Sequence, residues 1–244
     1  MKKLLLALSL TTTLTFADFI GGEVNLGYYT HAPSGTAQNG GDSVDIEDDL
    51  KWESENDIFL KAYFEHPIPL IPNIRLGYTR FTHEGSGEAS NSFTWGGMTL
   101  FKLSDDVYTK LDLDIYDISL YYEFLDNWLN FDAGLNIKYL SGSIVVNSTT
   151  KHEENSIELP VPMLYAKARI DIPATNLSFQ AEGDYISYGD NALYDLEIGA
   201  RYSFLLGFGV EAGYKTFKIK IDDVDDISMD ADFSGVYGKL VWDF

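Results

Sequence analysis

Apolar and polar residues alternate one by one along much of this chain, most clearly from Trp128 to Val146. Side chains alternate across a strand with a period of two, so this segment predicts a strand with one apolar face. Strands of soluble proteins usually span about five or six residues, and the greater length here favours a membrane-crossing strand. The apolar face holds Leu129, Phe131, Ala133, Leu135, Ile137 and Tyr139, and the other face holds Asn130, Asp132, Gly134, Asn136 and Lys138.

Similar segments recur along the chain and predict an all-β fold, a transmembrane antiparallel up-and-down β-barrel. Ten segments are recognisable, and an even number places both ends of the barrel domain on the periplasmic side. Barrels of eight or twelve strands remain possible. The predicted strands are Phe19–His31, Ile58–Glu65, Ile74–His83, Tyr108–Phe124, Trp128–Val146, Ile157–Ile172, Leu177–Tyr188, Leu193–Phe204, Phe208–Ile221 and Ala231–Phe244.

The fourth predicted strand changes phase along its length. Leu111, Leu113 and Ile115 share one face, whereas Ile118 and Leu120 lie on the other. An extra residue in one strand of a pair would produce such a shift. The pattern therefore predicts a β-bulge near Tyr116-Asp117.

Connections alternate between short turns, expected on the periplasmic side, and long external loops. The first long connection, Ala32–Asp57, is expected either to fold over the mouth or to extend its strands above the membrane. Aromatic residues gather near both ends of the strands, as interfacial anchoring predicts. The periplasmic candidates are Trp128, Phe124, Phe204, Phe208, Trp242 and Phe244, and the outer candidates are Tyr28, Tyr139, Tyr185 and Tyr188.

The last strand places Phe244, Trp242, Leu240 and Val236 on one face. Such an ending is typical of a barrel that closes its sheet within lipid. We predict that Trp242 and Phe244 form the signal by which assembly machinery recognises the chain.

The first residues have the pattern of a secretory signal peptide. Lys2 and Lys3 precede a short apolar stretch, which is too short to span a bilayer, and a small-x-small site follows at Thr15-Phe16-Ala17. We predict a signal peptide at residues 1–17 and one barrel domain at residues 18–244. The chain has no cysteine and a net charge of −21, which argues against thiolate chemistry and against nucleic-acid binding.

The turn His66-Pro-Ile-Pro-Leu-Ile-Pro-Asn73 contains Pro67, Pro69 and Pro72, which fix its backbone. Together with Tyr116-Asp-Ile-Ser-Leu-Tyr-Tyr-Glu-Phe-Leu-Asp-Asn-Trp128 and Gly134-Leu-Asn-Ile-Lys-Tyr-Leu-Ser-Gly142, it resembles a family of uncharacterised outer-membrane β-barrel proteins from Gram-negative bacteria. The resemblance runs over essentially the whole barrel domain and implies a fold and a location, but it assigns no catalytic residue. His66 to Asn73 are interpreted as a periplasmic turn.

Histidines near the outer strand ends suggest one enzymatic alternative. His31 and His83 lie at the outer ends of the first and third strands, and Asp57, Glu84 and Ser86 are the candidates to complete a rim site with them. No motif of fixed spacing supports this arrangement. The catalytic prediction is therefore none, with a rim-site hydrolase or acyltransferase as the second alternative.

Acidic clusters suggest a cation site. Carboxylates suit hard cations such as Ca²⁺, but no calcium-binding loop motif is present. The metal prediction is therefore none, with weak candidates at Asp222, Asp223, Asp225 and Asp226.

Charged residues on the non-lipid faces are expected to point into the lumen. Because both signs occur in a narrow barrel, they predict a salt-bridged plug; a narrow cation- or solute-permeable channel is the first alternative. A soluble lipocalin-like barrel is disfavoured, since its lumen should be apolar. The candidates are Asp132, Lys138, Lys167, Arg169, Asp171, Glu182, Asp184, Glu197, Arg201, Glu211 and Lys215.

These observations predict a structural or surface-interaction protein of the Gram-negative outer membrane, with acidic external loops. No cofactor is expected. The expected partners are outer-membrane lipid and lipopolysaccharide, barrel-assembly machinery and periplasmic chaperones, and no nucleic acid. The sequence does not identify a small-molecule ligand.

Overall fold

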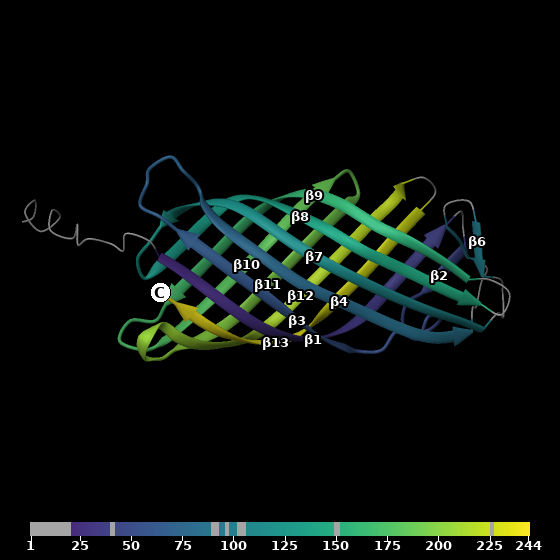
Figure 1. Ribbon diagram of the computed structural model, residues 1–244, viewed down its shortest axis with the longest axis horizontal. Helices are drawn as coiled ribbons and strands as arrows, with labels where there is room; N and C mark the ends of the chain where they lie inside the picture. The colour runs from purple at the N-terminus through teal and green to yellow at the C-terminus, as the bar shows by residue number, and fades with distance from the viewer. Residues whose placement is uncertain are drawn as a thin grey trace, which may run out of the picture.

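The computed structural model describes residues 21–39, 42–88, 93–95, 98–101, 106–148, 152–224 and 227–244, which form a closed antiparallel barrel (Figure 1). Ten long strands of this described part pair in chain order, and β13 pairs with β1 to close the sheet. The prediction of ten strands is confirmed. The signal peptide predicted at residues 1–17 lies outside the described residues. The ten strands are β1 (Gly21–Asn39), β3 (Glu55–Glu65), β4 (Asn73–Glu88), β7 (Asp106–Leu125), β8 (Leu129–Ser148), β9 (His152–Asp171), β10 (Leu177–Tyr188), β11 (Asn191–Ser203), β12 (Phe208–Val224) and β13 (Ile227–Asp243).

Short secondary-structure elements lie at the two ends of the barrel. A 3₁₀ helix, η1 (Leu205–Gly207), connects β11 to β12 at the end that carries Phe244, which we call the proximal end. At the opposite, distal end, β2 (Asp42–Asp45) pairs with β1, and β5 (Phe93–Trp95) pairs with β6 (Met98–Phe101). No helix among the described residues is long and apolar enough to cross a membrane.

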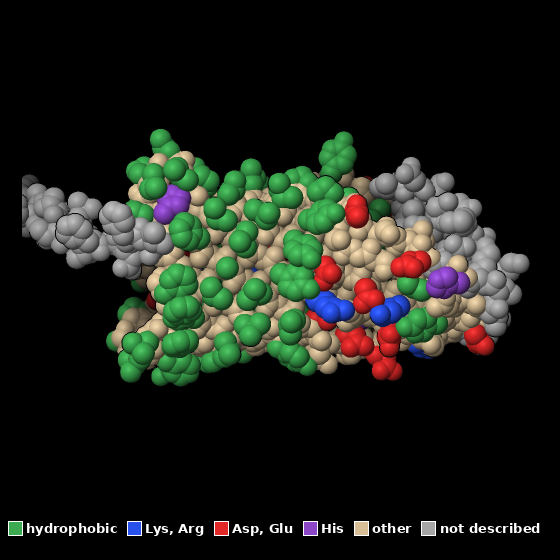
Figure 2. Space-filling view, viewed as in Figure 1, with side chains coloured by type: hydrophobic (Ala, Val, Ile, Leu, Met, Phe, Trp, Pro, Cys, Tyr) green, Lys and Arg blue, Asp and Glu red, His purple; other side chains and the backbone are tan. Residues whose placement is uncertain are grey.

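The outer surface of the barrel is apolar only in its proximal part. Figure 2 shows hydrophobic side chains covering that part, while acidic and basic side chains appear towards the distal end. We call the apolar zone the membrane belt, because lipid-facing residues of a transmembrane barrel form such a band. Exposed members of the belt include Leu26, Ile58, Leu60, Leu76, Ile118, Leu120, Leu135, Ile137, Leu164, Phe179, Ile198, Val210, Val236 and Leu240.

In strand β7 the apolar residues lie on the inner face beyond the belt and on the outer face within it. Its burial alternates without interruption from Val107 to Tyr121, and its pairing with β4 and β8 is regular through Tyr116 and Asp117. The predicted bulge at these residues is therefore wrong. Leu113 and Ile115 point inward above the belt, whereas Ile118 points outward within it. The change of apolar face reflects a change of surroundings, and the register shift between β7 and β8 falls later, between Glu123 and Leu125.

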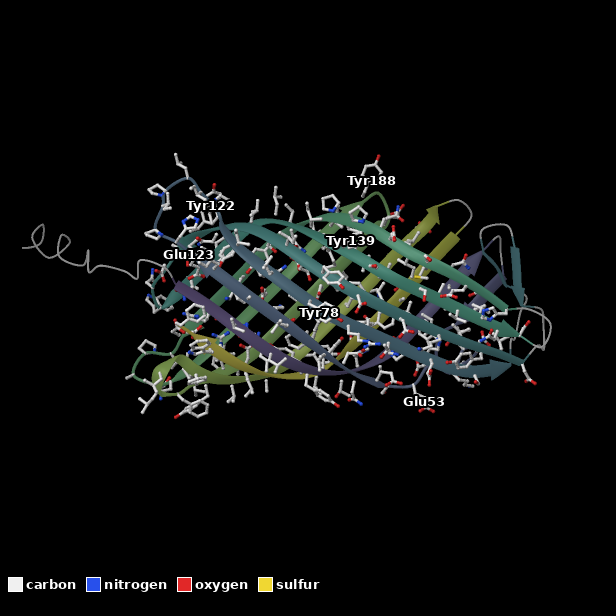
Figure 3. The ribbon with its side chains drawn as sticks, viewed as in Figure 1. Glu53, Tyr78, Tyr122, Glu123, Tyr139 and Tyr188 are labelled. Carbon is white, nitrogen blue, oxygen red and sulfur yellow. The ribbon has the colours of Figure 1, made fainter. Side chains whose placement is uncertain are left out.

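Aromatic side chains mark both edges of the belt. All six proximal candidates are exposed, and Phe208 stacks on Trp242. At the distal edge Tyr28, Tyr139 and Tyr185 are exposed as expected. Figure 3 shows Tyr139 and Tyr78 midway along the barrel, with Tyr122 near the proximal end. The barrel therefore extends well beyond the membrane on its distal side.

The proline-rich segment connects β3 to β4 at the proximal end. The side-chain oxygen of Asn73 accepts a hydrogen bond of 3.1 Å from the backbone of His66, and the His66 ring lies 3.2 Å from the carbonyl oxygen of Pro72. These contacts hold a turn whose prolines cannot donate backbone hydrogen bonds. His66 therefore has a local role in the turn, while the periplasmic location of this turn stays a prediction.

Phe244 extends the closing strand pair by one more residue. Its backbone exchanges two hydrogen bonds of 2.9 Å with Gly22. Its ring lies so close to Gly22 that a Cβ atom there would approach the ring to 2.7 Å. The contact requires glycine at position 22 and places Phe244 at the edge of the belt. Its role as an assembly signal stays a prediction.

A pair of substitutions on β8 tests where the belt ends. Leu135→Arg places a charge on the lipid-facing surface and should lower the free energy of unfolding by about 2–4 kcal/mol. Ser143→Arg lies on the same face beyond Tyr139 and should change it little. Equilibrium unfolding in lipid vesicles measures both values. Equal losses for the two variants would mean that the membrane covers the distal half as well.

Candidate functional site: an apolar chamber above a charged plug

Buried charges fill the barrel at the level of the membrane belt, and we call this group the plug. Nine of the eleven predicted lumen residues are buried there, whereas Arg169 and Asp171 form a partly exposed pair at the proximal end. Sequence reasoning missed several members, although each alternates with lipid-facing apolar residues. The plug comprises Lys61, Arg75, Lys138, Lys167, Arg201, Lys215 and Lys239 with Glu23, Asp117, Asp132, Glu182, Asp184, Asp195, Glu197 and Glu211.

Glu182 on β10 is the best-connected carboxylate of the plug. It accepts hydrogen bonds from Lys61 at 3.0 Å, from Arg75 at 2.9 Å, and from the hydroxyls of Tyr63 and Tyr165. Lys61 and Arg75 lie on β3 and β4, across the lumen from β10. Arg75 also binds Asp184 at 2.8 Å, and its guanidinium lies 4.3 Å from the centre of the Tyr165 ring. These bonds tie opposite walls together.

Arg201 forms a second crossing nearer the proximal end. Its guanidinium binds Glu23 at 2.9 Å and Glu211 at 3.1 Å, so it joins β11 to β1 and β12. Lys239 reaches Glu211 at 2.9 Å. Arg201, Lys239, Glu23 and Glu211 are thus all paired, which offsets the large free-energy cost of moving each ion out of water.

Three carboxylates in the plug resemble a cation site, because oxygens of Asp117, Asp184 and Asp195 lie within 4.8 Å of one another. The ammonium of Lys138 lies 2.8 Å, 3.7 Å and 3.1 Å from these three side chains. Arg75 also binds Asp184 and Lys215 also binds Asp195, so internal cations already pair with all three carboxylates. The predicted metal candidates lie elsewhere: Asp222 is exposed, no placement of the Asp223 side chain is described, and Asp225 and Asp226 lie outside the described residues.

An aromatic layer covers the plug on its distal side. Tyr29, Phe59, Phe81, Phe217 and Phe233 are each at most 4% exposed, and their rings pack against one another. Lys215 lies 5.9 Å from the centre of the Tyr29 ring, at the junction of the two layers. Burial of these rings separates the charged part of the lumen from the apolar part above it.

The two rim histidines belong to this layer. His31 lies 3.0 Å from Asp57 and 3.1 Å from His83, so Asp57 is the rim-site candidate that the structure places beside a histidine. Ser86 and Glu84 are exposed on the outer face of β4, where Glu84 instead accepts a hydrogen bond from Tyr108. Both nitrogens of the His31 ring are thus hydrogen-bonded to neighbouring side chains, an arrangement that suits a structural network.

Trp52 packs against the histidine pair on its distal side. Its ring stacks on His83 with a centroid distance of 5.5 Å, and its indole nitrogen donates to the Thr109 hydroxyl at 2.7 Å. His83 lies five residues past Tyr78 on β4, beyond the membrane belt. Burial, together with the neighbouring His31, lowers the pKa of His83 to about 4.

The distal half of the lumen contains a chamber of about 510 Å³. The connection after β2 folds into the mouth, so both predicted arrangements of Ala32–Asp57 occur: the strand extends, and the loop turns inward. Gly85 and Gly87 permit this, since a Cβ atom at either would meet backbone of residues 49–51 at 2.2 Å or less. The chamber wall includes Val44, Ile46, Leu50, Trp52, Phe81, Leu111, Leu113, Leu140, Ile144, Val146, Ile157, Leu159, Val161, Ile186, Leu193, Phe217, Ile219, Met229 and Phe233.

The chamber is suited to an apolar guest. Almost all of its lining is hydrocarbon, and Lys220 is its one charged lining residue among those described. A site of this volume and composition fits a small molecule that binds mainly by burial of apolar surface. The sequence predicted the charged plug but did not predict this apolar half, and an apolar lumen was the reason for which a lipocalin-like barrel was disfavoured.

Replacement of a plug cation tests the network. Arg75→Met leaves Glu182 and Asp184 short of a partner and should lower the free energy of unfolding by about 3–5 kcal/mol. Arg80→Met on the same strand is the control, because Arg80 is exposed on the outer face. Denaturant titration in vesicles compares the two. A loss in Arg75→Met no larger than that in Arg80→Met would show that the plug is not a paired network.

The Trp52–His83 stack reports the acidity of the buried ring. In a protein whose Trp95, Trp128 and Trp242 are replaced by Phe, fluorescence of Trp52 should change with a midpoint near pH 4. His83→Gln should abolish the transition. Because unfolded histidine titrates near about 6.5, acidification through this interval protonates the unfolded chain first and destabilises the fold. A midpoint near 6.5 in the folded protein would contradict burial of His83.

No protein-family model matches the chain, and no curated protein matches it. The proposed resemblance based on the proline turn therefore stays a prediction. Among solved structures, the outer membrane protease OmpT from Escherichia coli has a TM-score of 0.58 at 13% sequence identity, covering 96% of this chain and 100% of that chain. The translocator domain of autotransporter NalP from Neisseria meningitidis has a TM-score of 0.45 at 12% sequence identity, and the match covers 97% of this chain and 93% of that chain.

The attachment invasion locus protein Ail of Yersinia pestis, in complex with a heparin analogue, has a TM-score of 0.33 at 11% identity, covering 89% of this chain and 98% of that chain. At such identities the likeness to OmpT shows the fold and assigns no activity. The chain has the fold of an outer-membrane β-barrel.

Proposed function

We propose that this protein is an outer-membrane binding protein that holds an uncharged apolar molecule in its distal chamber. The observation that carries this proposal is the apolar chamber of about 510 Å³ above the aromatic layer and the plug. Apolar side chains that line an open chamber expose hydrocarbon to water, at a cost of about 25 cal/mol per Å² of apolar surface, unless a ligand covers them. Retention of such a space is best accounted for by a ligand that fills it.

The plug favours binding over passage through the barrel. Side chains from opposite walls meet at hydrogen-bond distance, and Arg75, Lys138, Arg201 and Lys215 are at most 2% exposed. A solute moving along the axis would have to break several of these pairs, each costly to leave unpaired. The channel alternative therefore requires a rearrangement of the plug.

Surface charge supports the neutrality of the ligand. Four aspartates lie on the outer faces of the distal strands, and although Lys110 pairs with Asp112 and Lys218 with Asp230, Asp114 and Asp232 have no lysine or arginine partner among the described ion pairs, and the chain as a whole is strongly acidic. An anionic ligand would approach against this field. The same acidic surface supports the predicted interaction role of the distal end, with divalent ions bridging to lipopolysaccharide.

The proposal includes location and assembly. Export by a signal peptide at residues 1–17, handling by periplasmic chaperones and recognition of Trp242 and Phe244 by assembly machinery would place the distal end outside the cell. The short proximal connections and the proximal position of Phe244 support this orientation. We propose no reaction, because the hydroxyl described beside the His31–His83–Asp57 group, that of Thr82, donates to Asp57 at 3.1 Å and not to a histidine nitrogen.

Binding of N-phenyl-1-naphthylamine, an uncharged apolar fluorophore, tests the chamber. The purified barrel should bind it, and Leu140→Trp, which fills the chamber, should weaken binding by about tenfold or more, as loss of a well-shaped apolar site does. Leu135→Trp is the matched control, because Leu135 faces lipid on the same strand. Fluorescence titration measures both dissociation constants.

Undiminished binding by Leu140→Trp would contradict the chamber as the site. The channel alternative is tested separately by planar-bilayer recording of the unmodified protein. The plug predicts no conductance steps, and regular steps would favour a pore.

A further inference from the structure

The distal wall of the barrel has a gap on one side. The β10–β11 hairpin turns back at Tyr188 and Asn191, whereas β9 begins at His152 and β12 continues to Val224. Pairing between β9 and β10 stops at Leu164–Tyr185, and pairing between β11 and β12 stops at Ala192–Lys220. Within the described part of the chain, residues 152–163 of β9 thus have a paired neighbour only in β8. Figure 1 shows β7, β8 and β9 continuing towards the distal end beyond this hairpin.

The free edge of β9 has the sequence of an edge strand. Pro160 and Pro162 lie within it, and proline is confined to sheet edges because it cannot donate to a ladder. Glu154 and Glu158 add exposed charge to the same stretch. Both features discourage pairing with another strand. The sequence therefore maintains this edge in an unpaired state.

The chamber reaches the gap. Its lining includes Leu159 on β9, Ile186 and Ser187 on β10, and Ala192 and Ile221 beyond the turn. Leu159 pairs with the inward-facing Leu140, yet it is 51% exposed. An inward apolar residue with this much exposure indicates that the wall beside it is open.

The proximal edge of the gap, formed by the β10–β11 hairpin, lies close to the membrane surface; we call this edge the lip. Tyr185, at the distal edge of the belt, is followed three residues later by Tyr188 at the tip of the hairpin, about 10 Å further along the strand. Tyr188 is 86% exposed, and Figure 3 shows it projecting from the barrel. Exposed tyrosines favour the interfacial zone of a bilayer. An apolar molecule dissolved in the outer leaflet would therefore meet the gap near the height at which it leaves lipid.

We propose that the gap bounded by β9, the β10–β11 hairpin and β12 is the entrance through which a membrane-partitioned, uncharged apolar molecule enters the chamber sideways. This inference rests on the proposed binding function and adds its route and source. Beside the gap, three exposed carboxylates, Glu158, Asp190 and Asp222, outnumber the one lysine of the lining, Lys220, and this balance disfavours an anionic amphiphile. The plug closes the axial route from the proximal side.

Because the chain has no cysteine, single cysteines can block the candidate routes selectively. Ser187→Cys places a thiol on the lip of the gap, and Ser86→Cys places one on the outer face of β4, on another side of the wall. Gln38→Cys, near the distal end of β1, tests whether the ligand enters through the distal mouth of the barrel instead. Each variant, in lipid vesicles, is labelled with a bulky maleimide-linked polymer, and stopped-flow fluorescence follows association of N-phenyl-1-naphthylamine.

Labelling at Ser187 should slow association and dissociation together by about tenfold, with little change in the dissociation constant, because a blocked entrance affects both rates. Labelling at Ser86 or Gln38 should leave both rates unchanged. Unaltered rates after labelling at Ser187, or slowing by the label at Gln38 alone, would overturn the side entrance while the chamber stands. If the unmodified barrel binds the fluorophore but the unlabelled Ser187→Cys protein does not, the assignment of Ser187 to the edge of the gap is wrong. If neither protein binds it, the chamber is not a binding site.

Discussion

Each strand of this barrel has two faces, and the medium that each face meets changes at the edge of the membrane. Within the belt, lipid lies outside and the lumen is charged; beyond the belt, water lies outside and the lumen is apolar. Along β7 this exchange occurs between Ile115, which points inward, and Ile118, which points outward. The strand keeps a regular alternation throughout. The division of the lumen into plug and chamber depends on this constraint.

The two interiors stabilise the barrel by different means. In the plug, Arg75 and Glu182 join opposite walls through charge-assisted hydrogen bonds, whose partial loss leaves an unpaired buried ion. In the distal half, burial of side chains such as Phe81 and Leu111 supplies the stabilisation, as in a soluble protein. The aromatic layer around Tyr29 separates the two.

Sequence patterning predicted the ten strands and most of the plug, because alternation is a local property that survives folding. It named Asp57 among three candidate neighbours of the rim histidines, but it did not predict that His31 and His83 contact each other. It assigned a bulge at Tyr116-Asp117, because alternation records which side is apolar but not what that side faces. Sequence patterning could not predict that Trp52 points into the lumen, because its contact with His83 joins segments that are distant in the sequence. Arg75 was missed although its neighbours Ile74 and Leu76 already marked it as inward.

The central claim is that an apolar molecule occupies the distal chamber while the plug stays closed. A crystal structure of the protein with a brominated, uncharged hydrocarbon tests this most directly, because bromine can be located by its anomalous scattering. The account predicts a bromine site among Leu111, Leu140 and Phe233, with Arg75 still bound to Glu182 and Asp184. Bromine found only along the outer belt, or within a plug whose ion pairs have separated, would contradict it.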